Sequence, residues 1–176
     1  MSSSLIPCGD PTKESTHAST RRALLLLALY FLLHATTRVL ISGSSLELDE
    51  AEQVVLAQQL RWGYGSQPPL YTWLQTGAFA LLGHRVLALA AVKNLLLFTL
   101  YLLTYRAARE SGATGRVALV AAATLLLLPQ IAWESQRDLT HSVLATACAA
   151  ATLLAGARLL RHGRPRHYLL LGLCAG

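Results

Sequence analysis

The residues best suited to chemistry lie in an acidic stretch around positions 47–52. Asp49 and Glu50 stand side by side there, and Glu52 follows closely. A carboxylate held at a helix start can act as a general base for a hydroxyl acceptor. Capping is a structural alternative, because Asp49 suits an N-cap and Glu52 lies three residues later, as a capping box requires. The two roles are compatible, and both predict a short helix over residues 49–62.

A second polar stretch follows, in which Gly63-Tyr64-Gly65 precedes Gln67-Pro68-Pro69-Leu70-Tyr71. The paired prolines stiffen the chain and favour an extended residue before them, which is typical of a plain loop-to-helix junction. The aromatic side chains offer another interpretation, since aromatic faces are common surfaces for stacking sugars. The candidate substrate-binding residues of this stretch are Tyr64, Gln67 and Tyr71.

A third polar stretch contains Arg137, Asp138 and His141. Asp138 and His141 are three residues apart and would share one face of a helix. Arg137 is the best local candidate for contacting a phosphate. The alternative is an ordinary solvated turn in which Asp138 caps the next helix. Elsewhere, Lys93 lies inside an apolar run, where ionisable groups are functional candidates by default.

The elements that must position these residues are membrane helices. Of the 176 residues, 53% are hydrophobic and only 14% are charged, whereas soluble domains have about 25% charged residues. The net charge of +6 is spread over basic clusters between apolar runs. That distribution follows the positive-inside bias and does not indicate a nucleic-acid partner. The three cysteines form no CxxC pair and predict no zinc site.

We therefore predict an all-α fold, a polytopic membrane helical bundle with juxtamembrane helices in the first extracytoplasmic loop. The first apolar run has about 19 residues and is long enough to span the bilayer. A cleaved signal peptide is the alternative, but its apolar region would be only about 7–15 residues long. The expected organisation is a disordered cytoplasmic tail at 1–20 and a transmembrane domain at 21–176, with a loop at 42–85 and spans at 23–41, 86–105, 117–132, 139–160 and 168–176.

The apolar stretch at 70–82 has about 13 residues, which is too short to span comfortably and suits an interfacial segment. If it does not cross, all basic loops fall on one side and the acidic stretch falls on the other. We therefore expect the N-terminus to be cytoplasmic and the acidic stretch to face outwards, in a protein of the bacterial inner (plasma) membrane. Because the last apolar run stops after about nine residues, we expect an incomplete transmembrane domain that is inactive alone.

The order of these stretches resembles a family. Asp49-Glu50 soon after the first span, then Gly63-Tyr64 and Pro68-Pro69-Leu70 with aromatics, is similar to GT-C type glycosyltransferases. The resemblance is to the glycosyltransferase 39, or protein mannosyltransferase-like, family, which includes the aminoarabinose transferases of lipid A. It covers about residues 23–176, and these motifs in combination are moderately specific.

The resemblance implies inverting transfer of a sugar from a polyprenyl-phosphate donor to a lipid, glycan or protein acceptor, on the extracytoplasmic face. It assigns the role of catalytic base or acceptor positioner to Asp49, with Glu50 beside it. Gln67 stands where the family often has a basic residue or histidine, and it brings no charge to a donor phosphate. His141 stands near the place of a second acid.

Other functions remain open from sequence. A multi-span transporter would use Lys93 and the acidic loop along a solute path, and a non-catalytic membrane scaffold would need neither. No cofactor is certain. The carboxylates could bind a divalent cation such as Mg²⁺ or Mn²⁺, but two acids and a histidine do not define a metal site.

Overall fold

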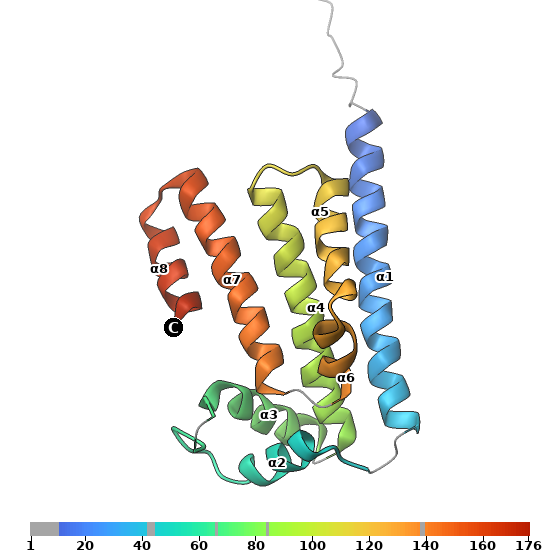
Figure 1. The fold of residues 1–176 in the computed structure, drawn as a ribbon, viewed down its shortest axis with the longest axis vertical. Helices are drawn as coiled ribbons and strands as arrows, with labels where there is room; N and C mark the ends of the chain where they lie inside the picture. The colour runs from blue at the N-terminus through green and yellow to red at the C-terminus, as the bar shows by residue number, and fades with distance from the viewer. Residues whose placement is uncertain (1–10, 42–44, 66, 84, 138–139) are drawn as a thin grey trace, which may run out of the picture.

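The structure is a computed structural model, and it describes residues 11–41, 45–65, 67–83, 85–137 and 140–176. Within these residues the chain is helical, apart from turns, loops and an isolated bridge between Tyr64 and Gln67. Three helices stand side by side and are long and apolar enough to cross a membrane (Figure 1). They are α1 (Pro11–Ile41), α4 (Val86–Glu110) and α7 (His141–His162). The predicted all-α helical bundle is therefore confirmed.

Helix α1 begins at Pro11, inside the segment predicted to be a disordered tail. Proline is favoured in the first turn of a helix, and residues 12–20 contain no glycine or second proline to interrupt it. The apolar part of α1 starts at Thr20. The remainder of the predicted tail, residues 1–10, lies outside the described residues.

Helix α4 is the central helix of the bundle. Half of its apolar window is buried, compared with 6% for α1 and 28% for α7. Phe31 of α1 packs against Tyr101 of α4, with ring centroids 5.3 Å apart in an edge-to-face arrangement. Val143 and Ala147 of α7 join the same core. Small residues such as Ala147 allow membrane helices to approach closely.

The apolar run predicted to span at 117–132 is broken in the structure. Helix α5 (Gly115–Ala123) continues as the 3₁₀ turn η1 (Thr124–Leu127). A π-helical turn η2 (Gln130–Glu134) and the short α6 (Ser135–Arg137) then leave at an angle of 77°. Pro129 explains the break, because proline lacks the amide hydrogen that a helix needs and forces Leu128 into an extended conformation.

Two short helices lie across one end of the bundle, below α4 and α7 in Figure 1. They are α2 (Leu48–Leu56) and α3 (Pro69–Leu82). Helix α3 has 14 residues and is not among the candidate spans. Helix α1 ends and α4 begins at this same end (Figure 1), as expected if residues 70–82 do not cross. Phe79 packs against Ala88 and Leu89, which docks α3 on the start of α4.

Helix α2 differs from the prediction at both ends. Its N-cap is Glu47, and the Glu50 side chain accepts a hydrogen bond from the Glu47 backbone amide at 3.3 Å. The capping role predicted for Asp49 and Glu52 is therefore wrong by two residues. The predicted helix over 49–62 ends at Leu56.

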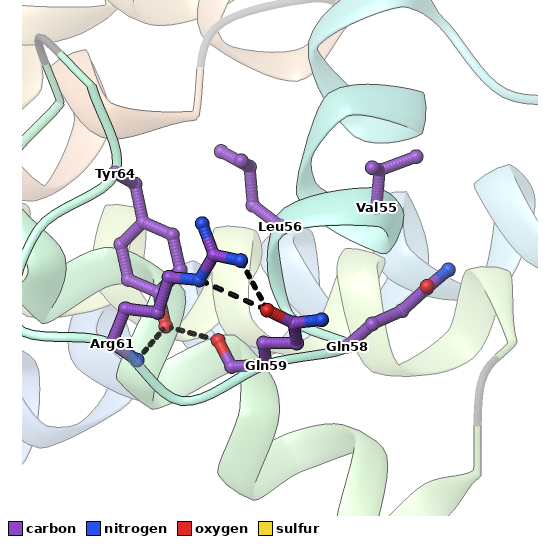
Figure 2. A pocket seen from close by; sticks show the side chains of 6 residues that line it. All are labelled: Val55, Leu56, Gln58, Gln59, Arg61 and Tyr64. Atoms are coloured by element: carbon purple, nitrogen blue, oxygen red, sulfur yellow. Dashed lines mark hydrogen bonds between the residues drawn. The ribbon is translucent and has the colours of Figure 1, made fainter.

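The early end of α2 has a cause in the following loop. The Tyr64 hydroxyl donates to the Gln59 carbonyl at 2.8 Å and accepts from the Arg61 amide at 3.0 Å (Figure 2). The Tyr64 side chain thus hydrogen-bonds backbone groups that would bond to each other's neighbours if the helix continued. Around it, a pocket of about 210 Å³ is lined by Val55, Leu56, Gln58, Gln59, Arg61 and Tyr64.

The opposite end of the bundle is basic. There Glu110, at the end of α4, pairs with Arg158 at 3.3 Å and Arg161 at 3.8 Å, both near the end of α7. Gly163, with φ of +59°, ends α7 in the left-handed conformation that glycine favours. Helix α8 (Pro165–Ala175) then packs back along α7. It starts three residues before the last run predicted from sequence.

Candidate active site

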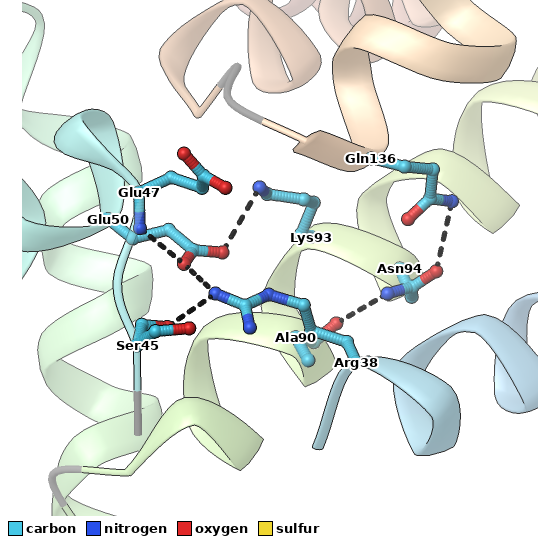
Figure 3. Close-up of polar contacts among 8 residues, drawn as sticks. All are labelled: Arg38, Ser45, Glu47, Glu50, Ala90, Lys93, Asn94 and Gln136. Atoms are coloured by element: carbon cyan, nitrogen blue, oxygen red, sulfur yellow. Dashed lines mark hydrogen bonds and ion pairs between the residues drawn. The ribbon is translucent and has the colours of Figure 1, made fainter. Parts of the chain in front are cut away.

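Glu50 is held at the centre of a buried ion cluster (Figure 3). Its carboxylate pairs with Arg38 from the end of α1 and with Lys93 of α4, whose Nζ lies 3.4 Å away. Glu50 is 1% exposed and Lys93 is 2% exposed. Because charges inside a protein need partners, one carboxylate joins three helices and fixes how α2 lies against the bundle.

A second polar contact, partly buried, joins the broken segment to the same region. Asn94, next to Lys93 on α4, donates to the Ala90 carbonyl at 2.9 Å. Its side-chain oxygen accepts from Gln136 of α6 at 3.2 Å (Figure 3). The two polar residues of α4 therefore bind two different neighbours, α2 through Lys93 and α6 through Asn94. This explains why polar residues are present inside an apolar helix.

Asp49 and Gln53 are four residues apart and share a face of α2, and Gln53, three residues after Glu50, lies between the two carboxylates around the helix axis. Asp49 is half-buried, whereas Gln53 is fully buried. The charge of Asp49 reaches both Tyr71 of α3 and His141 of α7. Glu50 therefore anchors α2, while Asp49, which points about 100° away from it, lies near two polar aromatic residues.

Gln53 connects α2 to both α3 and α7. Its Oε1 accepts a hydrogen bond from Thr72 at 3.1 Å, and its Nε2 lies 2.7 Å from Nε2 of His141. The His141 ring also packs at a tilt against Tyr71, with 5.1 Å between ring centroids. His141 directly follows the α7 N-cap, Thr140. Residues 88 positions apart in sequence thus meet at one end of the bundle.

Two buried side chains of α3 have polar atoms without a hydrogen-bond partner among the described residues. They are the Tyr71 hydroxyl and both amide atoms of Gln75, one turn further along. Tyr71 is 1% exposed and Gln75 is 0% exposed. Burial raises the pKa of the Tyr71 phenol well above its usual range, and the negative charges of Glu50 and Asp49 raise this pKa further. Tyr71 therefore stays a hydrogen-bond donor at physiological pH.

These side chains form one polar cluster at the end of the bundle that α2 and α3 cover. We define the polar cluster by its members, which are Arg38, Asp49, Glu50, Gln53, Tyr71, Thr72, Gln75, Lys93 and His141. It supplies carboxylates, cations and unpaired donors from five helices. Among the described residues, no group of three or more His, Cys, Asp or Glu side chains lies close enough to hold a metal ion.

A comparison with protein families shows to which family the chain belongs. Residues 66–176 match the family model described as dolichyl-phosphate-mannose-protein mannosyltransferase. The chain belongs to this family of GT-C type glycosyltransferases.

Two relatives from Rhizobium johnstonii extend the match to most of the chain. The lipopolysaccharide core galacturonosyltransferase RgtB is 43% identical over 170 residues, and RgtA, which has the same description, is 39% identical over 163 residues. Each alignment covers 93% of this chain but only 33% and 32% of the relative. The chain thus spans about a third of the length of these relatives. No solved structure matches it.

In this mannosyltransferase-family chain, the structure brings together four of the residues predicted from sequence to be catalytic or substrate-binding: Asp49, Glu50, Tyr71 and His141. The Tyr64 hydroxyl instead makes hydrogen bonds to backbone groups of its own loop. Gln67 closes the turn after Gly65 by donating its backbone amide to the Tyr64 carbonyl at 3.0 Å. Arg137 is exposed at the end of α6. Asp138 lies outside the described residues.

Sequence reasoning missed four members of the polar cluster: Arg38, Gln53, Thr72 and Gln75. Arg38 lies near the end of the first apolar run, where basic residues are common at the membrane interface. Gln53 and Gln75 carry no charge, so charge patterning could not find them. A usable signal existed for Gln75, because a glutamine in the middle of a 14-residue apolar helix calls for a partner. Lys93 was noticed, but only as weak evidence for a polar path.

Proposed function

We propose that the complete protein transfers a sugar from a polyprenyl-phosphate donor to a lipid, glycan or protein acceptor on the extracytoplasmic face of the bacterial inner membrane. Membership of a glycosyltransferase family favours this function over the transporter and scaffold alternatives. The identity to RgtB and RgtA supports galacturonic acid as the sugar and a lipopolysaccharide core as the acceptor.

The orientation is proposed from charge. The basic segments around Glu110 and Arg161 lie at one end of the bundle, and the acidic helix α2 lies at the other. Cytoplasmic loops of membrane proteins carry an excess of Lys and Arg. The basic end and the N-terminus of α1 would then be cytoplasmic, and the polar cluster would meet its substrates outside.

The observation that carries the proposal is the position of Asp49, half-buried beside Tyr71 and His141, while its neighbour Glu50 is locked between two cations. In the proposed step, Asp49 accepts the proton of an acceptor hydroxyl. The acceptor oxygen forms a bond to the anomeric carbon, and the bond from that carbon to the phosphate oxygen breaks. Polyprenyl phosphate leaves with the electron pair. Glu50 takes a positioning role instead of the catalytic one inferred from sequence.

Tyr71 and Gln75 are proposed substrate contacts. A buried polar group without a partner costs about 1–3 kcal/mol, and this chain keeps three such atoms on one face of α3. Hydroxyl-rich sugars supply the acceptors and donors that these side chains lack.

Replacing Asp49 with Asn in the full-length protein tests the proposal. We expect the rate of sugar transfer from a polyprenyl-phosphate donor to fall about 10²–10⁴-fold, as is usual when a general base is lost, without loss of folded protein. Glu134→Gln, an exposed acid on η2, is the matched control and should keep full activity. Full activity of Asp49→Asn would remove Asp49 from the chemistry.

A further inference from the structure

The buried amide of Gln53 bridges a hydroxyl and an imidazole. Thr72 Oγ1 lies 3.1 Å from Gln53 Oε1, and His141 Nε2 lies 2.7 Å from Gln53 Nε2. Gln53 and Thr72 are both 0% exposed. Water therefore cannot replace the bond between Thr72 and Gln53, and the direction of each bond has chemical consequences.

The direction follows from the orientation of the Gln53 amide, whose oxygen faces Thr72 and whose nitrogen faces His141. The amide oxygen of glutamine only accepts, and its NH₂ group only donates. Because Oε1 accepts from Thr72, the NH₂ group faces His141 and must find an acceptor there. The Nε2 of His141 is consequently the ring nitrogen without a proton. In a neutral imidazole the proton then resides on Nδ1.

Two features of the surroundings act on the charge of His141 in opposite directions, and burial of the ring, the stronger of them, disfavours the imidazolium. The negative charges of Glu52 and Asp49, both on α2, reach His141, and negative charges stabilise an imidazolium. Tyr71 of α3 covers the ring from another side. An imidazolium would place an N–H against the NH₂ group of Gln53 and would leave both donors without an acceptor.

We propose that Gln53 is a positioning residue that holds His141 as the neutral tautomer with its proton on Nδ1, so that His141 donates a hydrogen bond to a phosphate oxygen of the donor substrate. This inference rests on the proposed function. Donors aimed at the oxygen where charge develops stabilise the transition state. His141 then donates a hydrogen bond to the leaving phosphate, while Asp49, one turn before Gln53, accepts the proton of the acceptor hydroxyl.

The tautomer can be measured without catalysis. The full-length protein is labelled with ¹⁵N-histidine and reconstituted in lipid nanodiscs, and the His141 signals are assigned by their loss in His141→Asn. In the wild type we expect an unprotonated Nε2 and a protonated Nδ1. Adding a short-chain polyprenyl phosphate should shift the Nδ1 signal and leave Nε2 unprotonated.

Gln53→Glu reverses the bond, because a carboxylate only accepts. We expect Nε2 to become protonated and kcat to fall at least about 100-fold, as occurs when a catalytic histidine is held in the wrong tautomer. The KM for the donor should change much less. Gln58→Glu, the same exchange at an exposed position after α2, should leave both the spectrum and kcat unchanged.

Thr72→Val supplies a second variant in case Gln53→Glu fails to fold. Without the Thr72 hydroxyl the amide is free to rotate, so we expect a mixture of the two tautomers. A protonated Nε2 in the wild type would overturn the assignment. If the Nδ1 signal does not shift when polyprenyl phosphate is added, the proposed hydrogen bond from His141 to the phosphate is wrong. An inactive wild-type protein with the expected tautomer would instead refute the proposed function alone.

Discussion

Two neighbouring carboxylates on α2 have different surroundings and should respond differently to substitution. Glu50 is paired with Arg38 and Lys93 and is almost completely buried, whereas Asp49 is half-buried. Adjacent residues of a helix point about 100° apart, so one acid can anchor the helix while the next remains near the substrate. Loss of Glu50 should therefore affect stability first, and loss of Asp49 should affect the reaction first.

Glu50→Gln should lower the free energy of unfolding by about 3–5 kcal/mol, because it removes the carboxylate charge that pairs with buried Lys93 and half-buried Arg38. Chemical unfolding of the full-length protein in detergent measures this. Adding Lys93→Met should recover part of the loss, since the buried cation that no longer faces a negative charge at position 50 is removed as well. Glu52→Gln, on the exposed side of the same helix, should change stability by no more than about 0.5 kcal/mol. Equal losses for Glu50→Gln and Glu52→Gln would contradict the anchoring role.

At the scale of elements, hydropathy predicted the three helices that are long and apolar enough to span, while the interfacial position of α3 stays a prediction. It could not predict that Pro129 splits an apolar run into two segments at 77°, because both segments remain apolar. The boundaries of α2 also escaped sequence reasoning. Glu47, Asp49 and Glu52 all suit a helix start, and the pairing of Glu50 with α1 and α4 selects among them. That selection depends on helices far away in the sequence.

The polar cluster was predictable only in part for the same reason. Asp49 and His141 stood out by residue type, and both are in the cluster. Gln53 and Thr72 became visible only when α2, α3 and α7 were placed together. Tyr64 was attractive as an aromatic residue in a glycine-rich stretch, but its hydroxyl completes the fold of its own loop.

Labelling of single cysteines can test the path of α3. In a protein whose Cys8, Cys148 and Cys174 are replaced by Ser, cysteines at Leu60 and Arg85 flank α3, and both positions are exposed. We expect a membrane-impermeant maleimide to label both from the same side. A cysteine at exposed Ser111, beyond α4, should react from the other side. Labelling of Leu60→Cys and Arg85→Cys from opposite sides would mean that α3 crosses the membrane.

At the scale of the whole molecule, a carboxylate joins helices at each end of the bundle, and the two carboxylates differ in exposure. Glu50 joins α1, α2 and α4 where side chains are buried. Glu110 joins α4 to α7 at the basic end, where its own side chain is 25% exposed and that of Arg161 is 55% exposed. Water and salt screen such exposed pairs, which contribute about 0–1 kcal/mol.

Glu110→Gln should therefore lower the free energy of unfolding by no more than about 1 kcal/mol. Raising the salt concentration should reduce even this difference between variant and wild type, because screening weakens the exposed pairs in the wild type. The same salt series should leave the loss caused by Glu50→Gln nearly unchanged. Unfolding curves at low and high salt measure both quantities. A salt-independent loss of several kcal/mol for Glu110→Gln would argue that the basic end is closed by further protein.

The adjacent pair Lys93 and Asn94 has a consequence for the rotation of α4 about its own axis. Lys93 binds α2 and Asn94 binds α6, while most of the other buried side chains of α4 are apolar. Inserting one residue before Lys93 would turn both side chains by about 100° and separate them from Glu50 and Gln136. The hydropathy of the span would hardly change. Lys93 and Asn94 thus fix the rotation of α4 about its own axis. Its apolar residues alone would allow several different rotations.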